Sequence, residues 1–284
     1  MSGNNLSITP SGGGIGAQVD GIDLGHDVSD NLTGVLRQAL GEYGVLFFRE
    51  QTLSPEQHIA LAEQFGAINV NRFFAHVDGY PKIAEVRKEP TQTENIGGGW
   101  HTDHSYDQEP AMGSILVARE LPERGGDTLF ASMYLAFENL SDGLKETLCG
   151  LNAVHSSRHV FGASARYRQE GSDLAGRLGN PDAATQGAVH PVVIRHPISG
   201  RRALYVNPGF TLRFDGWSTQ DSAPLLQYLY AQAVRPENTY RFQWHPGSVA
   251  FWDNRATWHY ALNDYQGDRR LLHRITIDGE PLAA

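Results

Sequence analysis

Two His-x-Asp triplets occur in the sequence, and each places an imidazole and a carboxylate two residues apart. One contains His76 and Asp78, and the other contains His101 and Asp103. In an extended backbone, residues i and i+2 project to the same side, so either pair has a spacing that suits one metal ion. The spacing alone does not decide between them, because so short a motif also arises by chance.

The surroundings of the two triplets differ. The first lies in "HVDGYP", where Asp-Gly and Tyr-Pro dipeptides mark a turn and favour a structural role. The second lies in "GGGWHTDHSYD", where three glycines permit close approach of the backbone and a strand-like segment follows. We therefore predict that His101 and Asp103 are the metal-binding pair.

A third metal ligand must come from elsewhere in the chain. The segment "NRATWHYALNDY" offers His259, just after the strand-like "SVAFWD". Two histidines and one carboxylate on one face of an octahedron form the triad that holds non-heme Fe(II) and leaves positions open for oxygen chemistry. A lone histidine is more often structural, so the prediction for His259 depends on the motifs around it.

Two arginines follow in "RRLLHRITIDG". Arg270 and Arg274 lie four residues apart on a predicted strand, where they share a face with Leu272 and Thr276. A charge that points into an apolar strand face is costly unless it meets an anion. The alternative, an exposed strand edge, accounts for Arg269 better than for the other two. We therefore expect Arg270 and Arg274 to bind anions.

The elements that position these residues are predicted from periodicity and from capping residues. Residues 30–44 have a helical apolar period that begins at an acidic cap, Asp30, and ends at a glycine. Residues 54–66 begin with a serine cap and a proline in the first turn, and they also end at a glycine. Between the two helices, the apolar run 45–49 predicts a buried strand.

Strand-like pieces predominate after about residue 100, separated by turns such as "PERGGD" and "PISGR". These pieces cover residues 113–119, 127–133, 188–197, 202–207, 240–253 and 269–279. Helical insertions are expected at 133–151 and 220–234, and a mobile loop at 163–188. The pattern predicts a mainly β fold with helical insertions (α+β), a double-sheet jelly roll, and a single domain over residues 1–284.

Composition excludes several classes of function. Of the 284 residues, 40% are hydrophobic and 19% are charged, which permits a packed core. A net charge of −9 and the lack of a basic run argue against nucleic acid as a partner. The single cysteine, Cys149, excludes intrachain disulfides and Cys-rich zinc sites. The sequence has no signal-peptide pattern and no apolar stretch of membrane length, so we expect a cytoplasmic protein without a membrane partner. The sequence does not decide whether the protein forms a homo-oligomer.

The order of these motifs closely resembles the taurine and 2,4-dichlorophenoxyacetate dioxygenase family. The likeness runs from "SITPSGGGIGAQVDGIDL" through "VLFFREQTLSPEQHIALAEQFG" and "GGDT" (125–128) to the last predicted strand. It implies a cupin-like double-stranded β-helix and an enzyme that uses Fe(II), 2-oxoglutarate and O2. Such an enzyme hydroxylates an organic substrate and releases succinate and carbon dioxide.

The resemblance also implies a role for individual residues. The implied iron ligands are His101, Asp103 and His259. Thr128 and Arg270 would hold the distal carboxylate of 2-oxoglutarate, since a planar guanidinium suits a carboxylate and threonine adds a hydroxyl donor. Arg274 matches the family position that meets the anionic group of the primary substrate.

The substrate positions depart from those of taurine dioxygenase itself. Taurine enzymes carry a His and a Tyr after the second helix, where this chain has Asn71 and Phe74, and an Asn where it has Gly97. This loss of polar groups argues against taurine. A pocket edged by phenylalanines would favour a larger apolar or aromatic body, although each ring could equally belong to the core; these residues are Phe73, Phe74, Phe161 and Phe210.

We therefore predict a small anionic substrate with an apolar or aromatic body, of the phenoxyalkanoate, alkyl sulfate or sulfonate type. The segment from residue 132 to 162 looks more like the phenoxypropionate-cleaving members of the family. Two alternatives compete with this hypothesis. A halogenase would carry Gly or Ala in place of Asp103. A non-catalytic cupin-like metal-binding protein would not release succinate when supplied with iron and 2-oxoglutarate.

Overall fold

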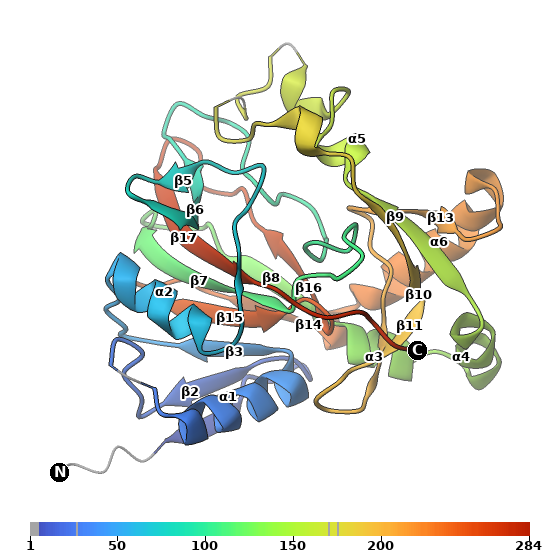
Figure 1. The fold of residues 1–284 in the computed structure, drawn as a ribbon, viewed down its shortest axis with the longest axis horizontal. Helices are drawn as coiled ribbons and strands as arrows, with labels where there is room; N and C mark the ends of the chain where they lie inside the picture. The colour runs from blue at the N-terminus through green and yellow to red at the C-terminus, as the bar shows by residue number, and fades with distance from the viewer. Residues whose placement is uncertain (1–5, 27, 170, 175) are drawn as a thin grey trace.

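The computed structural model describes residues 6–26, 28–169, 171–174 and 176–284 (Figure 1). The first five residues, and residues 170 and 175 of the predicted mobile loop, lie outside the described part. Within these described ranges, no helix has the length and apolar character needed to cross a membrane.

The larger sheet has the strand order β1-β2-β3-β15-β7-β17-β6-β5, and β4 also pairs with β17. Its pairs are antiparallel except for β2 and β3. In chain order the strands are β1 (Ser7–Pro10), β2 (Ala17–Asp20), β3 (Val45–Phe48), β4 (Ile68–Asn69), β5 (His76–Val77), β6 (Tyr80–Lys88), β7 (Gly113–Glu120), β15 (Val249–Asp253) and β17 (Arg270–Ile277). The strand predicted at 45–49 is thus an inner strand of this sheet.

A smaller sheet faces the larger one. Its order is β14-β8-β16, formed by β14 (Thr239–Phe242), β8 (Thr128–Ser132) and β16 (Thr257–Ala261). Phe47 of the larger sheet stacks on Phe242 with ring centroids 4.2 Å apart, and it meets Phe130 edge-on at 5.6 Å. Because these rings come from both sheets, one apolar cluster of the core lies between two β layers, as a jelly roll requires.

Two helices cover the outer face of the larger sheet (blue in Figure 1): α1 (Asp30–Tyr43) and α2 (Pro55–Glu63). The cap of α1 is Ser29, whose side chain accepts from the Leu32 N–H. The prediction of Asp30 as the cap is therefore wrong by one residue, because a serine directly before it already supplies the acceptor. Gly44 ends α1 in a left-handed conformation, as predicted.

Helix α2 has the predicted serine cap and proline start, with Ser54 and Gln57 forming a reciprocal capping box. It ends at Glu63 rather than at Gly66, so the predicted end is three residues too late. The reason is that the Phe65 N–H turns back to the Ala62 carbonyl, and the Phe65 ring packs against Phe251 of β15. Packing on the sheet thus ends the helix before the glycine.

The remaining elements form an extension at one end of the sheets (Figure 1). The helix predicted at 133–151 is two helices, because Ser141 is extended and interrupts it. The strand predicted at 188–197 is likewise split in two. The helices here are α3 (Met133–Glu138), α4 (Asp142–Cys149), α5 (Arg158–Phe161) and α6 (Thr219–Ala233). The strands are β9 (Asn152–Ser156), β10 (Gly187–Pro191), β11 (Val193–Arg195), β12 (Arg202–Leu204) and β13 (Thr211–Phe214).

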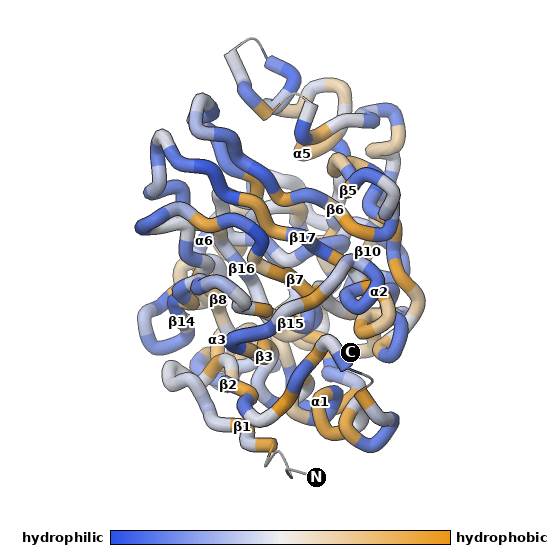
Figure 2. The backbone as a smooth tube through the Cα atoms, turned by 90° about the vertical axis from the view of Figure 1, so that its left-hand side faces the viewer, coloured by the Kyte–Doolittle hydropathy of each residue, from blue (hydrophilic) through white to orange (hydrophobic). Residues whose placement is uncertain are grey.

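Hydropathy follows this arrangement. In Figure 2, hydrophobic segments (orange) run through the strands at the centre of the molecule, whereas the outer loops are largely blue or white. The short 3₁₀ turns Arg166–Arg168, Pro181–Ala183 and Pro236–Asn238 occur among these outer connections. The first two belong to the predicted loop 163–188, which lies at one end of the space between the layers.

Candidate active site

His101, Asp103 and His259 come together at the open end of the two sheets. One donor atom from each residue lies within 4.8 Å of the others. His101 Nε2 is 3.7 Å from Asp103 Oδ1, and His259 Nε2 is 3.8 Å from Asp103 Oδ2. Donor atoms bound to one ion at about 2.1 Å lie roughly 3 Å apart in an octahedral site, so the three side chains need only a small closure to hold a cation.

An isolated β-bridge positions the two histidines. The His101 N–H donates to the His259 carbonyl at 3.2 Å, and the His259 N–H donates to the His101 carbonyl at 2.9 Å. The chain turns directly after Asp103, where His104 has a φ of 59°. The β-bridge therefore holds His101 in extended backbone, and a turn follows the triplet at once.

Hydrogen bonds and packing orient the imidazoles. His101 Nδ1 lies 2.8 Å from the Gly99 carbonyl, an arrangement in which Nδ1 donates and Nε2 keeps its lone pair for a metal. His259 Nδ1 has no hydrogen-bond partner among the described residues. Its ring instead packs against Trp252, with ring centroids 4.7 Å apart. The glycine run before His101 thus supplies an orienting carbonyl.

The charges of the three residues suit a divalent cation. Burial raises the pKa of the Asp103 carboxyl, but the positive charge of Arg274 and the nearby imidazoles outweigh burial and hold this pKa well below its usual range. Burial and the neighbouring His101 hold the pKa of His259 well below its ordinary value. An ionised carboxylate next to a neutral imidazole is the protonation state that metal binding requires.

Arg270 and Thr128 form a second polar feature of the site. Arg270 is 3% exposed, and its Nε and Nη2 have no hydrogen-bond partner among the described residues. The Thr128 hydroxyl accepts from Trp244 Nε1 at 3.0 Å, which leaves its own proton free to donate. The free donors of Arg270 and Thr128 fit an anionic ligand, because burying guanidinium N–H groups without an acceptor costs folding free energy.

The glycines of "GGDT" make room for Arg270. Gly126 has a φ of 71°, and a Cβ at this position would lie 3.0 Å from Arg270 Cδ and 3.1 Å from its Nε. A larger residue would therefore be strained and would push the guanidinium side chain away. The motif lets the start of β8 approach β17 closely.

A cavity of about 640 Å³ joins these features. Of the side chains that the sequence predicted for metal, 2-oxoglutarate and substrate, all but Phe73 line it: Asn71, Phe74, His101, Asp103, Thr128, Phe161, Phe210, His259, Arg270 and Arg274. Gly97 also lines it. Phe73 does not, so its placement at the pocket edge is wrong. Its ring stacks on Phe161 at 4.2 Å from behind, in a buried aromatic cluster.

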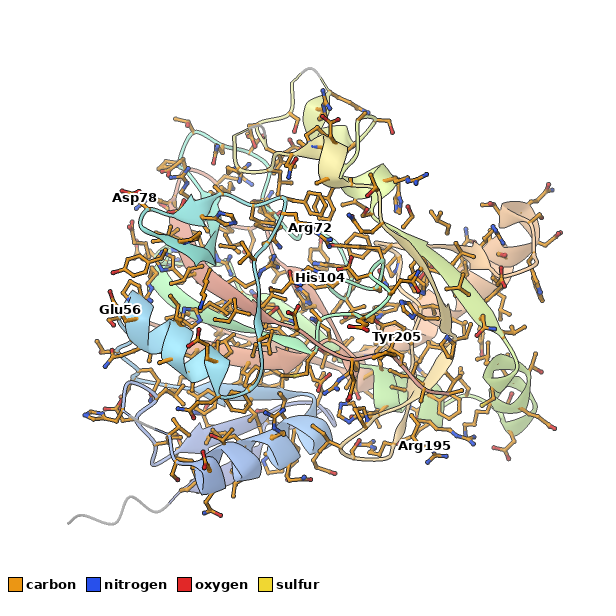
Figure 3. All side chains as sticks on the ribbon, in the orientation of Figure 1. Glu56, Arg72, Asp78, His104, Arg195 and Tyr205 are labelled. Carbon is orange, nitrogen blue, oxygen red and sulfur yellow. The ribbon has the colours of Figure 1, made fainter. Side chains whose placement is uncertain are left out.

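Sequence reasoning missed several residues of the cavity wall. Tyr106 lines it from three positions after Asp103, and its closeness to the motif was an available signal. Leu174 and Leu178 line it from the predicted loop 163–188, where no periodicity marks them. Neither residue of the other triplet lines the cavity: His76 Nε2 lies 2.9 Å from the backbone carbonyl of Asn71, and Asp78 is exposed at the edge of the molecule (Figure 3).

Comparison with known proteins identifies the family. Residues 7–276 match the family described as "Taurine catabolism dioxygenase TauD, TfdA family". The chain belongs to this family. The predicted TauD/TfdA membership is thereby confirmed over nearly the whole chain.

Individual members of the TauD/TfdA family are similar to this chain over nearly its whole length. The chain is 37% identical to an alkylsulfatase of Acinetobacter baylyi, covering 97% of this chain and 86% of the relative. It is 34% identical to an alpha-ketoglutarate-dependent sulfate ester dioxygenase of Pseudomonas putida, covering 97% of this chain and 90% of the relative. A crystal structure of a taurine dioxygenase from Burkholderia xenovorans is 35% identical and superimposes with a TM-score of 0.80, covering 97% and 91%.

Membership of the TauD/TfdA family establishes the class of reaction. The protein is an Fe(II)- and 2-oxoglutarate-dependent dioxygenase, an oxidoreductase, with Fe(II), 2-oxoglutarate and O2 as cofactor and co-substrates. The predicted double-stranded β-helix fold is confirmed as well. The alternative of a non-catalytic cupin-like metal-binding protein is set aside, because the family and its relatives are dioxygenases.

Proposed function

We propose that this dioxygenase oxidises a small organic anion with an apolar body, with alkyl sulfates and other sulfate esters as the first candidates. Phenoxyalkanoates and longer sulfonates belong to the same chemical type. The observation that carries the proposal is the position of Arg274. It places a buried guanidinium beside Asp103, at an aromatic part of the cavity wall.

The proposal assigns a role to each polar residue of the cavity. The residues assigned to Fe(II) are His101, Asp103 and His259. Arg270 and Thr128 are assigned to the distal carboxylate of 2-oxoglutarate, which would give Nε and Nη2 of Arg270 an acceptor. When bound, iron and 2-oxoglutarate supply the oxidation: O2 is consumed, 2-oxoglutarate becomes succinate and carbon dioxide, and one oxygen atom enters the substrate.

Arg274 has donors to spare for a substrate anion. Its Nη1 donates to Asp103 Oδ2 at 3.1 Å, its Nε has no partner among the described residues, and the guanidinium lies 4.4 Å from the Phe74 ring centroid. A substrate held here has its anionic group close to Asp103. The carbon next to that group is then the closest to the proposed metal site.

This placement determines the product for a sulfate ester. Hydroxylation of the carbon that bears the ester oxygen replaces a C–H bond by C–OH and gives a hemiacetal-like carbon. The carbon–sulfate bond then breaks, the hydroxyl proton is lost, and an aldehyde and inorganic sulfate are formed. Phe74, Phe161 and Phe210 of the cavity wall would surround the apolar body of the substrate.

A substrate screen tests the proposal. Purified protein with Fe(II) and 2-oxoglutarate is offered alkyl sulfates of increasing length, phenoxyalkanoates, longer sulfonates and taurine, and succinate release is measured. We expect taurine to be a poor substrate and the larger anions to be better. Taurine outperforming every larger anion, or neutral alcohols matching the anions, would overturn the proposed substrate class.

An arginine variant separates the two anion sites. Arg274→Ala should raise the KM of the best substrate at least tenfold, because a charge-assisted bond is lost, while the affinity for 2-oxoglutarate stays nearly unchanged. Equal losses for both anions would show that Arg274 does not bind the primary substrate in particular.

We also propose that residues 1–284 form one domain. The family match over residues 7–276 supports this, as does the cavity shared by both sheets. The cytoplasmic location and the lack of nucleic-acid or membrane partners stay predictions from the sequence. Sedimentation of the purified protein would decide between a monomer and a homo-oligomer.

A further inference from the structure

The turn that follows Asp103 has an unusual conformation. His104 has a φ of 59°, in the left-handed region that side chains other than glycine rarely adopt. The Asp107 N–H donates to the His104 carbonyl at 3.0 Å and closes the turn. Strained residues of this kind persist only where their surroundings hold them in place. The groups that hold His104 therefore also decide where the neighbouring Asp103 carboxylate points.

The Asp107 carboxylate is the main such group. His104 Nδ1 lies 2.9 Å from its Oδ2, and Arg72 Nη2 lies 2.8 Å from both of its oxygens. The side chain of Asp107 is only 16% exposed. Its backbone carbonyl is 2.9 Å from Nε2 of His190 on β10. Asp107 thus connects three segments that are far apart in the sequence, and Figure 3 shows Arg72 and His104 near each other at the centre of the molecule.

Neutral hydrogen bonds hold the rest of the turn. Thr102 Oγ1 donates to the Asn254 carbonyl at 2.6 Å, and Ser105 Oγ accepts from Asn207 Nδ2 at 2.9 Å. These contacts place the turn against the sheets. None of these neutral bonds involves the His104 side chain or the segment before β5. They therefore cannot replace the contacts that the Asp107 carboxylate makes with His104 and Arg72.

Arg72 extends the connection to the substrate side of the cavity. It lies within the segment in which Asn71 Oδ1 accepts from the backbone N–H groups of Phe73 and Phe74. Asn71 and Phe74 line the cavity, whereas Arg72 and Asp107 do not. Asp107 therefore lies behind the site, between the turn that carries a proposed metal ligand and a segment of the substrate wall.

We infer that Asp107 is a positioning residue of the active site: it holds His104 in the conformation that directs Asp103 towards the metal, and through Arg72 it sets the substrate wall against the same turn. Asp107 contacts neither metal nor substrate in this arrangement. The inference rests on the proposed metal site. It also differs from a purely structural role, because it predicts a loss of metal affinity in a protein that still folds.

The test uses the full chain without metal, titrated with Co(II), whose visible absorption reports binding independently of activity. Asp107→Asn keeps the size of the side chain but loses the charge that strengthens both hydrogen bonds. We expect the Kd for Co(II) to rise tenfold or more, the usual scale for residues that orient metal ligands. The matched control is Glu109→Gln, which removes the same charge from an exposed residue two positions further on and should leave the Kd unchanged.

A second variant covers the case in which Asp107→Asn does not fold. His104→Gly removes the imidazole that contacts Asp107, and glycine adopts a φ of 59° without strain. Metal affinity should still fall tenfold or more, because the side-chain contact with Asp107 is lost and only the backbone bond and the neutral contacts of the turn remain. For both variants, the thermal unfolding of the metal-free protein is measured beside the Co(II) titration.

The outcomes are distinct. A wild-type protein that binds no Co(II) would overturn the proposed metal site and the inference together. Tight binding by the wild type with an unchanged Kd in the folded variants would overturn the inference alone. A raised Kd in Asp107→Asn and His104→Gly, with normal binding in Glu109→Gln, is the result that the inference requires.

Discussion

At the scale of single residues, Arg270 combines deep burial with guanidinium nitrogens, Nε and Nη2, that have no hydrogen-bond partner among the described residues. We predict that Arg270→Ala raises the Kd for 2-oxoglutarate well over tenfold, because the buried carboxylate loses a partner worth about 2–5 kcal/mol. Calorimetric titration without oxygen measures this. Arg269→Ala is the control, since Arg269 pairs with Glu89 and Glu120 near the surface. An unchanged Kd in Arg270→Ala would show that another cation binds the co-substrate.

Asp103 gives a second prediction at this scale. Asp103→Ala should abolish succinate release and weaken Co(II) binding at least a hundredfold, because the remaining two imidazoles carry no charge to balance the cation. The matched control is His76→Ala, in the other His-x-Asp triplet. Among the described residues, the His76 side chain has one hydrogen-bond partner, the backbone carbonyl of Asn71. Full activity in Asp103→Ala, or metal loss in His76→Ala, would contradict the assignment.

At the scale of elements, Arg177 anchors the segment that covers the cavity. Its side chain is 3% exposed and donates to the Arg87 carbonyl at 2.9 Å, the Glu94 carbonyl at 2.8 Å and Asp173 Oδ1 at 2.7 Å. The first two bonds join the predicted mobile loop to β6 and to the segment after it, and the third lies within the loop. The loop is therefore anchored at this point rather than free along its whole length.

We predict that Arg177→Met opens this cover. Loss of the guanidinium removes the part-buried hydrogen bonds to the Arg87 and Glu94 carbonyls and destabilises the anchored conformation of the loop by about 1–3 kcal/mol. Limited proteolysis within residues 163–188 should accelerate by about tenfold, since cleavage follows the population of the open form. Arg168→Met, which changes an exposed arginine of the same segment, should cleave at the wild-type rate. Equal rates in both variants would exclude Arg177 as the anchor.

At the scale of the whole molecule, buried histidines make stability depend on pH. Burial and the nearby Arg119 lower the pKa of His58 to about 3, and burial together with His190 does the same for His155. The unfolded chain titrates near 6.5, so between these values it binds protons that the folded chain does not. Stability therefore falls as the pH drops below about 6.5, and continues to fall towards pH 3.

From pH 7 to pH 5 each of these two histidines should cost about 2 kcal/mol of unfolding free energy. Urea unfolding of the metal-free protein at both pH values measures the total pH dependence, to which His190, His259 and His273, whose pKa values burial also lowers, contribute as well. His58→Leu should remove about 2 kcal/mol of the difference. A pH dependence that His58→Leu leaves intact would exclude His58 as a source.

Local signals in the sequence were enough to predict much of this protein. The two-residue spacing of His101 and Asp103, the arginines on one strand face, and the serine and proline at the start of α2 all depend on neighbouring residues. These patterns predicted most elements and singled out His101, Asp103, His259, Arg270 and Arg274, which all line the cavity, whereas Thr128 and Asn71 were named only through the family resemblance. The start of α1 was misplaced because two adjacent residues, Ser29 and Asp30, could both cap the helix. The end of α2 was misplaced because the packing of Phe65 on Phe251 ends the helix before Gly66.

Only the tertiary structure decided which residues meet. The bridge between His101 and His259, the stacking of Phe73 behind Phe161, and the contacts of Asp107 join segments far apart in the chain. No periodicity records such contacts, because they depend on how whole sheets and loops pack rather than on the conformation of neighbouring residues. For the same physical reason, the cavity wall from Leu174 and Leu178 became visible only in the folded chain.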